Sequence, residues 1–489
     1  ASDVYKRQFS WGAVLNEQET NSATISVTTV GVEDGQTLSI TFPTSSQIQS
    51  FSNTVTDNAT TINIDGHYLR STLTQGGALH TVTADVSDAA GNAAAQVTSS
   101  SFTMDRIAPT MTITSTNSGV TDGSTTNDPT IALTFTSSEV TTDFAEADIT
   151  VSNGTISAFA STSTTVYTAT FTPTADGATT IDVGGSTFTD AAGNNNTAAT
   201  QFNWTYDGTA PSAFTVGAVS STGNTVVSNY WNSTNTGIDV IVPVASDTSL
   251  TGGTIQLRAN VAGGGYENLG DAYTIQGSDL GTNKTISNTA GTFEALSAGL
   301  AEGESVNFTA IITDASSNST TGIASGTTIA VDQTPPAVDT FTMSDTTLKT
   351  GETSTVTLVF SEAVSGFDSG DDVTAPNGTL AAMTSEDNIT WTGTYTPTAD
   401  VEDATNVLTL ATSYTDVAGN TGPSATTSNY IVNTKNDPPT AVNDTATIAE
   451  DSGLSSTNVI SNDTDNSGVV ADNDTLTLTA VSIDSASKG

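Results

Sequence analysis

Apolar and polar residues alternate in short runs along most of this chain. In one run Ile131, Leu133 and Phe135 take every second position, and the segments 24–28 and 167–171 repeat the pattern. A period of two residues predicts strands that bury one face and leave the other in water. Turn signals rich in Gly, Asn and Asp separate the runs, and no segment has a convincing helical period. The pattern predicts an all-β chain of short strands without helices.

A five-residue loop occurs four times and divides the chain into units. Each copy begins with Asp and ends with Asn, and an Asp or Asn that precedes a proline follows 17 or 18 residues after the loop begins. Repetition at intervals of more than 100 residues predicts a tandem array of whole domains. The loops are Asp88–Asn92, Asp190–Asn194, Asp314–Asn318 and Asp416–Asn420, and the linker residues are Asp105, Asp207, Asp332 and Asn433.

The units are about 100 residues long, which is enough for a small core. Each unit has about seven predicted strands, and the clearest one, the second, has a hairpin signal at Asn153-Gly154. The third unit is longer, and its extra residues are expected around the glycine-rich stretch 263–277. Residues 1–8 begin without Met and are interpreted as a non-native leader outside the fold. The expected domains are 9–104, 109–206, 211–331 and 336–433, followed by the partial domain 436–489.

Short linkers join the expected domains. Arg106–Ala108, Gly208–Ala210 and Gln333–Pro335 lead into or end in proline. A few residues next to proline cannot act as a flexible tether. We therefore expect an elongated file of β-sandwich domains.

The pairing of these loops with these linkers resembles the bacterial immunoglobulin-like repeats of large surface adhesins and biofilm proteins. The resemblance covers residues 9–433. Residues 436–439 and 462–465 resemble the start of a bacterial cadherin-like repeat. The two resemblances imply immunoglobulin-like β-sandwiches, an extracellular or bacterial cell-surface location, calcium dependence and a role in adhesion.

The chain is strongly acidic, with 52 Asp and Glu against 9 Lys and Arg and a net charge of −43. Residues 109–206 contain no Lys or Arg. Because a polyanion repels nucleic acids and anionic membranes, both are poor partner hypotheses, and divalent cations are better ones. Solubility in a saline medium is the plainer explanation of the same charge. The absence of Cys excludes disulfides and thiolate chemistry, and no apolar run is long enough to span a membrane.

Few residues suit catalysis. His67 and His80 are the only histidines, and His80 is expected to face solvent on a strand. A Ser-His-Asp triad is therefore impossible outside the first unit. Paired acids for glycoside hydrolysis are not excluded by composition, but only 6% of the residues are aromatic, which does not suggest a sugar cleft. We expect no enzymatic activity in this segment.

Acidic residues are expected to converge where a linker meets the next domain. In a seven-stranded sandwich the first strand begins at the end that carries the second-to-third and sixth-to-seventh loops. Asp105 in the linker, Glu139 after a strand and Asp190 in the repeated loop should therefore meet. Such oxygens suit Ca²⁺, which takes six to eight of them. The alternative is that each loop Asp merely starts a turn, and both can hold together.

The same argument supplies further candidate calcium ligands. Asp332, Glu362 and Asp416 should meet before the fourth unit, and Asp207, Asp314 and Asp247 before the third. The cadherin-like resemblance implies three more ligands in the terminal piece. These are Asp437, Asp463 and Asp465.

These observations predict a spacer of a bacterial surface adhesin that calcium stiffens between domains. Its partners would be the neighbouring domains of the same chain, and an unknown surface ligand, protein or polysaccharide, reached through other modules. Two alternatives remain. The domains can be accessory modules of a large secreted enzyme, or one of them, most plausibly the third, can bind a ligand directly.

Overall fold

The computed structural model describes residues 3–43, 49–296, 299–436 and the single residues 440, 442, 444, 460 and 463. It is mostly β-strand (46%) with little helix (7%), so the predicted all-β class is confirmed. The described residues form four hydrophobic cores, and we name the domains after them. They span Trp11–Met104, Met111–Trp204, Val216–Val331 and Phe341–Val432.

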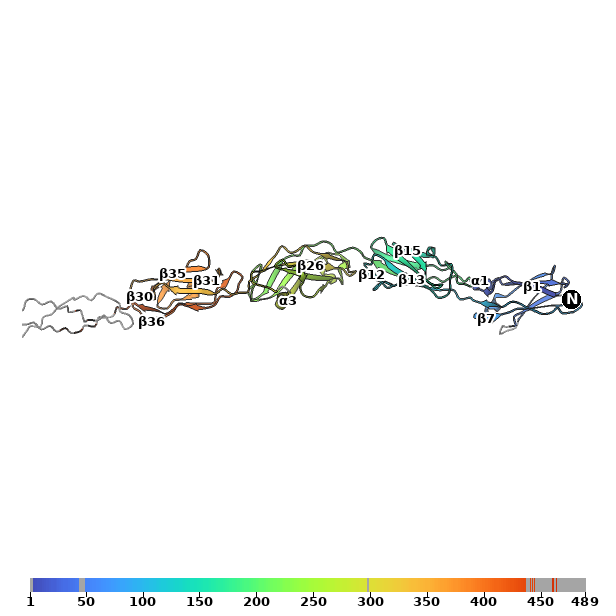
Figure 1. The fold of residues 1–489 in the computed structure, drawn as a ribbon, viewed down its shortest axis with the longest axis horizontal. Helices are drawn as coiled ribbons and strands as arrows, with labels where there is room; N and C mark the ends of the chain where they lie inside the picture. Colours follow the sequence, from blue (N-terminus) through green and yellow to red (C-terminus); the bar gives the residue numbers. More distant parts are fainter. Residues whose placement is uncertain are drawn as a thin grey trace, which may run out of the picture. The chain divides into compact units, whose positions relative to one another are not determined.

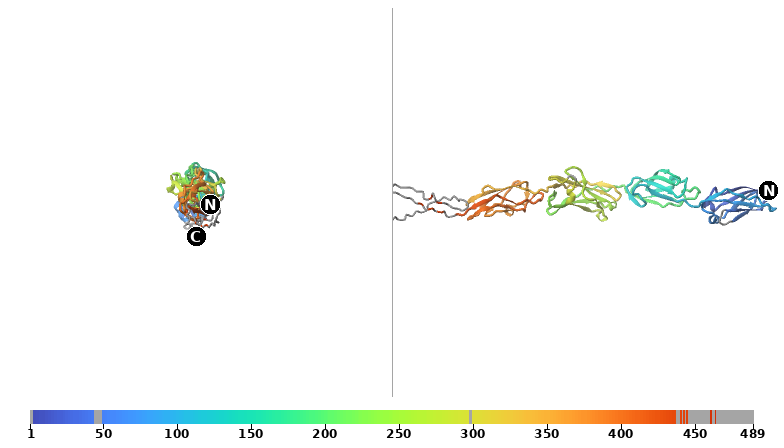
Figure 2. Two further views of the ribbon diagram at one scale, coloured as in Figure 1. Left: turned by 90° about the vertical axis from the view of Figure 1, so that its left-hand side faces the viewer. Right: turned by 60° about the horizontal axis from the view of Figure 1, so that its bottom comes forward.

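The chain divides into two compact units. The first contains Ala1–Ala210 together with the loop Asp314–Asn318, and the second contains the remainder. The four domains can be followed by colour in Figure 1 and Figure 2.

The second domain is a sandwich of two four-stranded sheets. The sheet orders are β11-β13-β16-β15 and β12-β18-β17-β14, and β13 and β15 are labelled in Figure 1. Ile131, Leu133 and Phe135 point into the core with at most 1% exposure, as their alternation predicts. The elements are β11 (Met111–Ser115), β12 (Ser124–Thr126), β13 (Ile131–Ser137), η1 (Glu146–Asp148), β14 (Ile149–Ser152), β15 (Gly154–Ser161), β16 (Val166–Pro173), β17 (Gly177–Val183) and β18 (Phe202–Tyr206).

The hairpin predicted at Asn153-Gly154 is wrong. β14 pairs with β17 in one sheet and β15 pairs with β16 in the other, so the chain changes sheets at this point. Asn153 has the left-handed φ of 52° that the signal reflects. Gly154 is needed for packing, because a Cβ there would lie 2.2 Å from the ring of Phe171.

The first domain has three small sheets, with orders β1-β3-β6, β5-β4-β8-β9 and β2-β10-β7. β1 pairs with β3 from Asp3↔Val30 to Phe9↔Ile25, so residues 3–8, which the sequence analysis left out of the fold, belong to a sheet. A ladder of backbone hydrogen bonds does not require a particular sequence, which explains the difference. The elements are β1 (Asp3–Phe9), β2 (Val14–Leu15), α1 (Glu17–Thr20), β3 (Thr24–Val30), β4 (Thr37–Thr41), β5 (Ser50–Thr54), β6 (Ala59–Asn63), α2 (Gly66–Thr72), β7 (Gly76–His80), β8 (Thr83–Val86), β9 (Val97–Thr98) and β10 (Phe102–Met104).

Two further predictions fail in this domain. The chain does form helices, but α1 and α2 are only 4 and 7 residues long, too short to show a helical period. His80 is buried at 2% exposure, whereas Leu79 is 64% exposed. The ring of His80 packs against Phe102 at 5.7 Å, and its Nε2 lies 3.1 Å from the carbonyl oxygen of Thr74.

In the second unit, the third domain pairs the sheet β19-β21-β25 with a larger sheet β20-β28-β26-β22-β23. The extra strands β23 and β24 both pair with β22 and lie in the glycine-rich stretch where additional structure was expected. The elements are β19 (Val219–Gly223), β20 (Tyr230–Trp231), β21 (Asn235–Pro243), η2 (Thr248–Leu250), β22 (Thr254–Val261), β23 (Glu267–Asn268), β24 (Tyr273–Thr274), η3 (Gly277–Asp279), β25 (Asn283–Thr289), α3 (Ala290–Glu294), β26 (Ser305–Thr313), β27 (Ser319–Thr321) and β28 (Ile329–Val331).

The fourth domain repeats one sheet of the second, with the order β29-β31-β35-β34. Gly378 repeats the packing role of Gly154, since a Cβ would lie 2.3 Å from the ring of Tyr395. The elements are β29 (Val338–Met343), β30 (Thr347–Lys349), β31 (Ser354–Phe360), β32 (Val364–Ser365), α4 (Ser369–Asp372), β33 (Val373–Thr374), β34 (Gly378–Leu380), β35 (Thr390–Pro397), β36 (Glu402–Asn406), β37 (Thr409–Leu410), β38 (Thr415–Asp416), β39 (Ala425–Thr426) and β40 (Tyr430–Asn433).

One feature common to all four domains positions the residue that follows the last strand. A short strand runs parallel to the last strand of its domain in the pairs β2–β10, β12–β18, β20–β28 and β30–β40. This pairing continues into the linker, where the N–H of Asp105 donates to Leu15 and that of Asp332 donates to Trp231. The linker residue is therefore held beside the residue that follows the short strand. In the first three domains that residue is an asparagine, namely Asn16, Asn127 and Asn232.

Candidate functional site

The repeated five-residue loop, called here the receiving loop, has an internal hydrogen-bond pattern. In Asp190–Asn194, Oδ1 of Asp190 accepts from the backbone N–H of Ala192 (2.8 Å) and of Asn194 (2.9 Å). Its Oδ2 accepts from Nδ2 of Asn194 at 2.9 Å. Gly193 takes a φ of 87°, which favours glycine. The turn explanation of the loop Asp is therefore correct, and it leaves lone pairs of the carboxylate free for a cation.

The first acidic cluster lies where this loop meets the linker. One carboxylate oxygen each from Asp105, Glu139 and Asp190 lies within 4.8 Å of the others. The three residues come from the linker after β10, the segment after β13 and the receiving loop. Two oxygens bound to one Ca²⁺ at about 2.4 Å lie at most about 4.8 Å apart, so the spacing fits a shared calcium ion.

Charge within the first cluster is only partly offset. Burial, followed by the charges of Asp105 and Asp190, raises the pKa of Glu139. Oδ1 of Asp105 accepts a hydrogen bond from Nε2 of Gln75 at 3.0 Å. Two basic side chains of the first domain and its linker are engaged elsewhere, since Arg70 and Arg106 form ion pairs with Glu17 at 3.0 and 3.6 Å.

A clasp of hydrogen bonds accompanies the first cluster and joins the first domain to the second. Nδ2 of Asn194 donates to the carbonyl oxygen of Asp105 at 2.9 Å, and Oδ1 of Asn194 accepts from the N–H of Glu17 at 2.8 Å. Nδ2 of Asn16 donates to the carbonyl oxygen of Ala192 at 3.0 Å. Asn194 is 2% exposed, so both ends of its amide are satisfied in a buried setting.

The second acidic cluster has the same design in the second unit. Carboxylate oxygens of Asp332, Glu362 and Asp416 lie within 4.8 Å of one another. Asp416 is 1% exposed, and its Oδ2 accepts from Nδ2 of Asn420 at 2.8 Å. No ion pair between described residues involves any of these three carboxylates.

A fourth carboxylate, missed by sequence reasoning, joins the second cluster. Burial raises the pKa of Asp332 to about 7, together with a hydrogen bond to Glu302 and the charges of Asp416, Glu302 and Glu362. The pKa of Glu362 is also raised, by burial and then by the charges of Asp416 and Glu302. Glu302 precedes β26 and has no marked counterpart in the repeat, so no sequence signal pointed to it. It also holds the linker, because Oε2 accepts from the N–H of Gln333 at 3.1 Å.

The clasp recurs at the second cluster. Nδ2 of Asn420 donates to the carbonyl oxygen of Asp332 at 2.9 Å, and Oδ1 accepts from the N–H of Ser233 at 2.9 Å. Nδ2 of Asn232 donates to the carbonyl oxygen of Ala418 at 2.7 Å. Sequence reasoning also missed these asparagines, although Asn16, Asn127 and Asn232 each follow a short strand and offered a repeated signal.

The candidates before the third domain do not form a third cluster. Within the first unit, Oδ2 of Asp207 accepts from the hydroxyl of Ser316 at 2.9 Å, and its carbonyl accepts from Nδ2 of Asn318 at 2.8 Å. Asp314 is occupied within its own loop. Asp247 caps η2 by accepting from the N–H of Ser249 at 2.9 Å. The groups of three acidic residues that the described part of the chain brings together do not include Asp207, Asp247 or Asp314.

Two of the three candidate ligands in the terminal piece lie outside the described residues. Asp437 and Asp465 lie outside the described residues, as does most of the segment that resembles a cadherin-like repeat. Asp463 is described, and its Oδ1 accepts from the N–H of Val442 at 2.7 Å.

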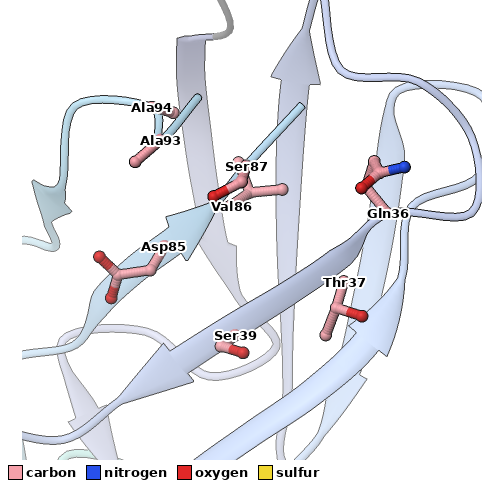
Figure 3. A pocket seen from close by; sticks show the side chains of 8 residues that line it. All are labelled: Gln36, Thr37, Ser39, Asp85, Val86, Ser87, Ala93 and Ala94. Atoms are coloured by element: carbon pink, nitrogen blue, oxygen red, sulfur yellow. The ribbon is translucent and has the colours of Figure 1, made fainter. Parts of the chain in front are cut away.

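The first domain also has a polar hollow on its surface. It is lined by residues in and next to the paired strands β4 and β8, and Figure 3 labels Asp85 and Gln36 among the side chains of its lining. The carboxylate of Asp85 accepts two hydrogen bonds from Nε2 of Gln96, at 3.0 and 3.1 Å. The lining holds one acid and no histidine, so it offers no acid–base pair.

The family comparison agrees with this description. Residues 105–206 and 332–432 each match the family model of a bacterial immunoglobulin-like domain. These are the two stretches that contain the acidic clusters. For these two stretches, the resemblance to bacterial immunoglobulin-like domains that was inferred from the loops and linkers is confirmed.

Solved structures of similar fold include three bacterial or adhesion proteins. One is a Ca²⁺-stabilized adhesin that helps an Antarctic bacterium reach out and bind ice, with 19% identity over 88% of this chain and 98% of that one and a TM-score of 0.36. A tetra-tandem repeat from the extending region of a large adhesion protein has 18% identity over 86% and 100%, with a TM-score of 0.26. Invasin, a bacterial integrin-binding protein, has 14% identity over 88% and 79%, with a TM-score of 0.25. At these identities the likeness concerns the fold alone.

A search of the curated proteins found no match. Among the helices of the described residues, none is long and apolar enough to cross a membrane.

Proposed function

We propose that this chain is an extracellular spacer of a bacterial surface adhesin, in which Ca²⁺ stiffens junctions between immunoglobulin-like domains. The observation that carries the proposal is the pair of three-carboxylate clusters, each built from a linker and two loops of the domain that follows it. The proposed ligands are Asp105, Glu139 and Asp190 in the first cluster and Asp332, Glu362 and Asp416 in the second.

The reason is electrostatic. Three carboxylates within 4.8 Å repel one another. Burial first, and the charges of neighbouring carboxylates after it, raise the pKa values of Glu139 and Asp332, so the charged forms are disfavoured. A bound divalent cation reverses the sign of the interaction and ties the linker to the next domain. Carboxylate and carbonyl oxygens without nitrogen or sulfur ligands favour Ca²⁺ over Zn²⁺.

A spacer of this kind would act mechanically. It would hold a ligand-binding module, contributed by another part of the protein, away from the cell, and its own contacts would be with neighbouring domains. Catalysis has no part in this proposal, because the carboxylates stand at linkers and the matched family is one of immunoglobulin-like domains.

Calorimetric titration of Ca²⁺ into the full chain tests the proposal. We expect two main binding events and a rise in melting temperature. The free energy of unfolding should increase by mass action, by about 2.7 kcal/mol when Ca²⁺ is in hundredfold excess over the dissociation constant. Glu139→Gln should remove one event and Glu362→Gln the other. The exposed Glu146→Gln, in the same domain as Glu139, should remove neither.

A second measurement addresses the linkers. Small-angle scattering should show less flexibility with calcium than with chelator, and Asp190→Ala should abolish this gain at the first cluster and leave the second cluster intact. If millimolar Ca²⁺ gives no heat and melting is the same in chelator, the acidic loops are ordinary turns and the calcium mechanism is wrong.

A further inference from the structure

The first domain carries a receiving loop whose partner is not among the described residues. In Asp88–Asn92, Oδ1 of Asp88 accepts from the N–H of Ala90 (3.0 Å) and of Asn92 (2.8 Å), and Oδ2 accepts from Nδ2 of Asn92 (2.9 Å). Gly91 has a φ of 86°. These are the bonds and the backbone conformation of the Asp190 loop, so the first domain builds the same device.

The Asp88 loop differs from the other receiving loops in the hydrogen-bond partners of its final asparagine. Asn194 and Asn420 are 2% and 0% exposed, and each donates to the carbonyl of a linker aspartate at 2.9 Å. Asn318 does the same at 2.8 Å. Asn92 is exposed, and its described side-chain contact is the one to Asp88 within the loop. One N–H and the carbonyl oxygen of its amide therefore face solvent.

A second residue of the receiving side is also in place. Glu33 follows β3 as Glu139 follows β13 and Glu362 follows β31. Its Oε2 accepts from the N–H of Ala89 at 3.0 Å, which brings its carboxylate to the receiving loop. The first domain thus presents two of the three acidic positions of a cluster, and the position it lacks is the one that a linker supplies elsewhere.

We propose that Asp88–Asn92 and Glu33 form an interaction surface for another immunoglobulin-like domain, whose acidic linker runs into β1. The contacts of the other three receiving loops define the partner. The partner domain has an asparagine directly after the strand that runs parallel to its last strand, in the position of Asn16 and Asn232. It also has a linker aspartate whose carbonyl oxygen accepts a hydrogen bond from Nδ2 of Asn92. This surface depends on hydrogen bonds and goes beyond the proposed calcium function.

The alternative occupant, a second copy of the chain in trans, is less suited. At the three other receiving loops, the linker that is held leads along the chain to the first strand of the same domain. A linker from another copy would have to reach the loop without that covalent path, and its ordering would cost additional free energy.

The test extends the full chain. A copy of residues 109–211, which carries its own Asn127 and the linker Asp207–Pro211, is placed ahead of Ala1, and amide hydrogen exchange of segment 86–94 is followed by mass spectrometry in chelator. We expect exchange in this segment to slow at least about tenfold, toward the rate of segment 414–422, which contains an engaged receiving loop and occurs once in the extended protein. Asn92→Ala should abolish the slowing, as should Asn127→Ala in the added copy, whereas Gln18→Ala on the exposed side of α1 should not.

Two outcomes would overturn the proposal. One is unchanged exchange of segment 86–94 in the extended protein. The other is a dimer of the unextended chain in sedimentation that Asn92→Ala dissolves, because the occupant would then be a second copy. The melting temperature of the unextended Asn92→Ala chain should equal that of the unaltered chain, which separates loss of binding from loss of folding. Because the exchange is measured without calcium, failure of the calcium proposal leaves this result intact.

Discussion

The two acidic clusters share a geometry and differ in charge. Each joins a linker aspartate, a glutamate after a strand and the aspartate of a receiving loop, with oxygens within 4.8 Å. Around the first cluster stand Gln75, which donates to Asp105, and the pair of arginines that engage Glu17. At the second cluster Ser233 takes the place of Glu17, and Glu302 adds a fourth carboxylate.

This difference separates two properties of each cluster, its hydrogen bonds to the linker and its demand for a cation or a proton. The asparagine clasp is the same in both, so holding the linker does not depend on local charge. The charge differs, so the demand for a cation or a proton should be greater at the second cluster, where burial and its neighbours raise the pKa of Asp332 to about 7.

The largest effect is expected from breaking the clasp. Asn194→Ala and Asn420→Ala each leave buried groups without partners, at about 1–3 kcal/mol per orphaned group. Hydrogen exchange should accelerate more than tenfold around each loop, and by similar factors at both. Asn92→Ala, the exposed equivalent, should change stability by less than about 0.5 kcal/mol. Equal effects at all three positions would show that the clasp contributes nothing at the linkers.

The next effect concerns the buried charge of the linker. Asp332→Asn should raise the melting temperature of the fourth domain by several degrees in chelator at pH 7.5, because it removes the carboxylate that burial and three neighbouring acids disfavour. It should also remove the calcium-dependent gain at that cluster. Asp105→Asn should give a smaller rise, since Gln75 already donates to Asp105. Thermal unfolding with segment-resolved exchange distinguishes the two domains, and a larger rise for Asp105→Asn would reverse the comparison.

The third effect is a pH dependence with a defined sign. The pKa of Asp332 rises from 3.8 to about 7 on folding, so the folded protein holds a proton that the unfolded chain releases. The stability from this group is fully present below about pH 4 and is lost as the pH rises through 7. In chelator the fourth domain should therefore melt at lower temperature at pH 8 than at pH 5, and Asp332→Asn should flatten this dependence. Stability that increases over this interval because of Asp332 would contradict the assignment.

The smallest effect is expected at Glu302. Glu302→Gln removes one acidic neighbour and can donate a hydrogen bond to Asp332, so the pKa of Asp332 should fall while the fold is retained. An NMR titration of the Asp332 carboxyl would measure the shift. Glu304→Gln, two residues away, is the matched control and should leave the titration unchanged.

Several features of the site were predictable because they repeat. The spacing of loop, linker and strand was enough to bring Asp105, Glu139 and Asp190 together, since the ends of a sandwich follow from its strand order. The same reasoning failed for Asp247, which caps η2, because the third domain departs from the repeat. It also missed Glu302, whose approach to Asp332 depends on a segment without a counterpart in the other domains.

The sequence alone determined the fold class, the repeat and the junctions where acids gather, because a period of two and a recurring loop are local patterns that need no knowledge of contacts. Only the tertiary structure decided the rest. It placed His80 in a core and Leu79 in solvent, turned the Asn153-Gly154 signal into a crossing between sheets, and joined Asn16 to Ala192. Each of these depends on contacts between residues far apart in the chain, and the pairing of strands, not local pattern, sets those contacts.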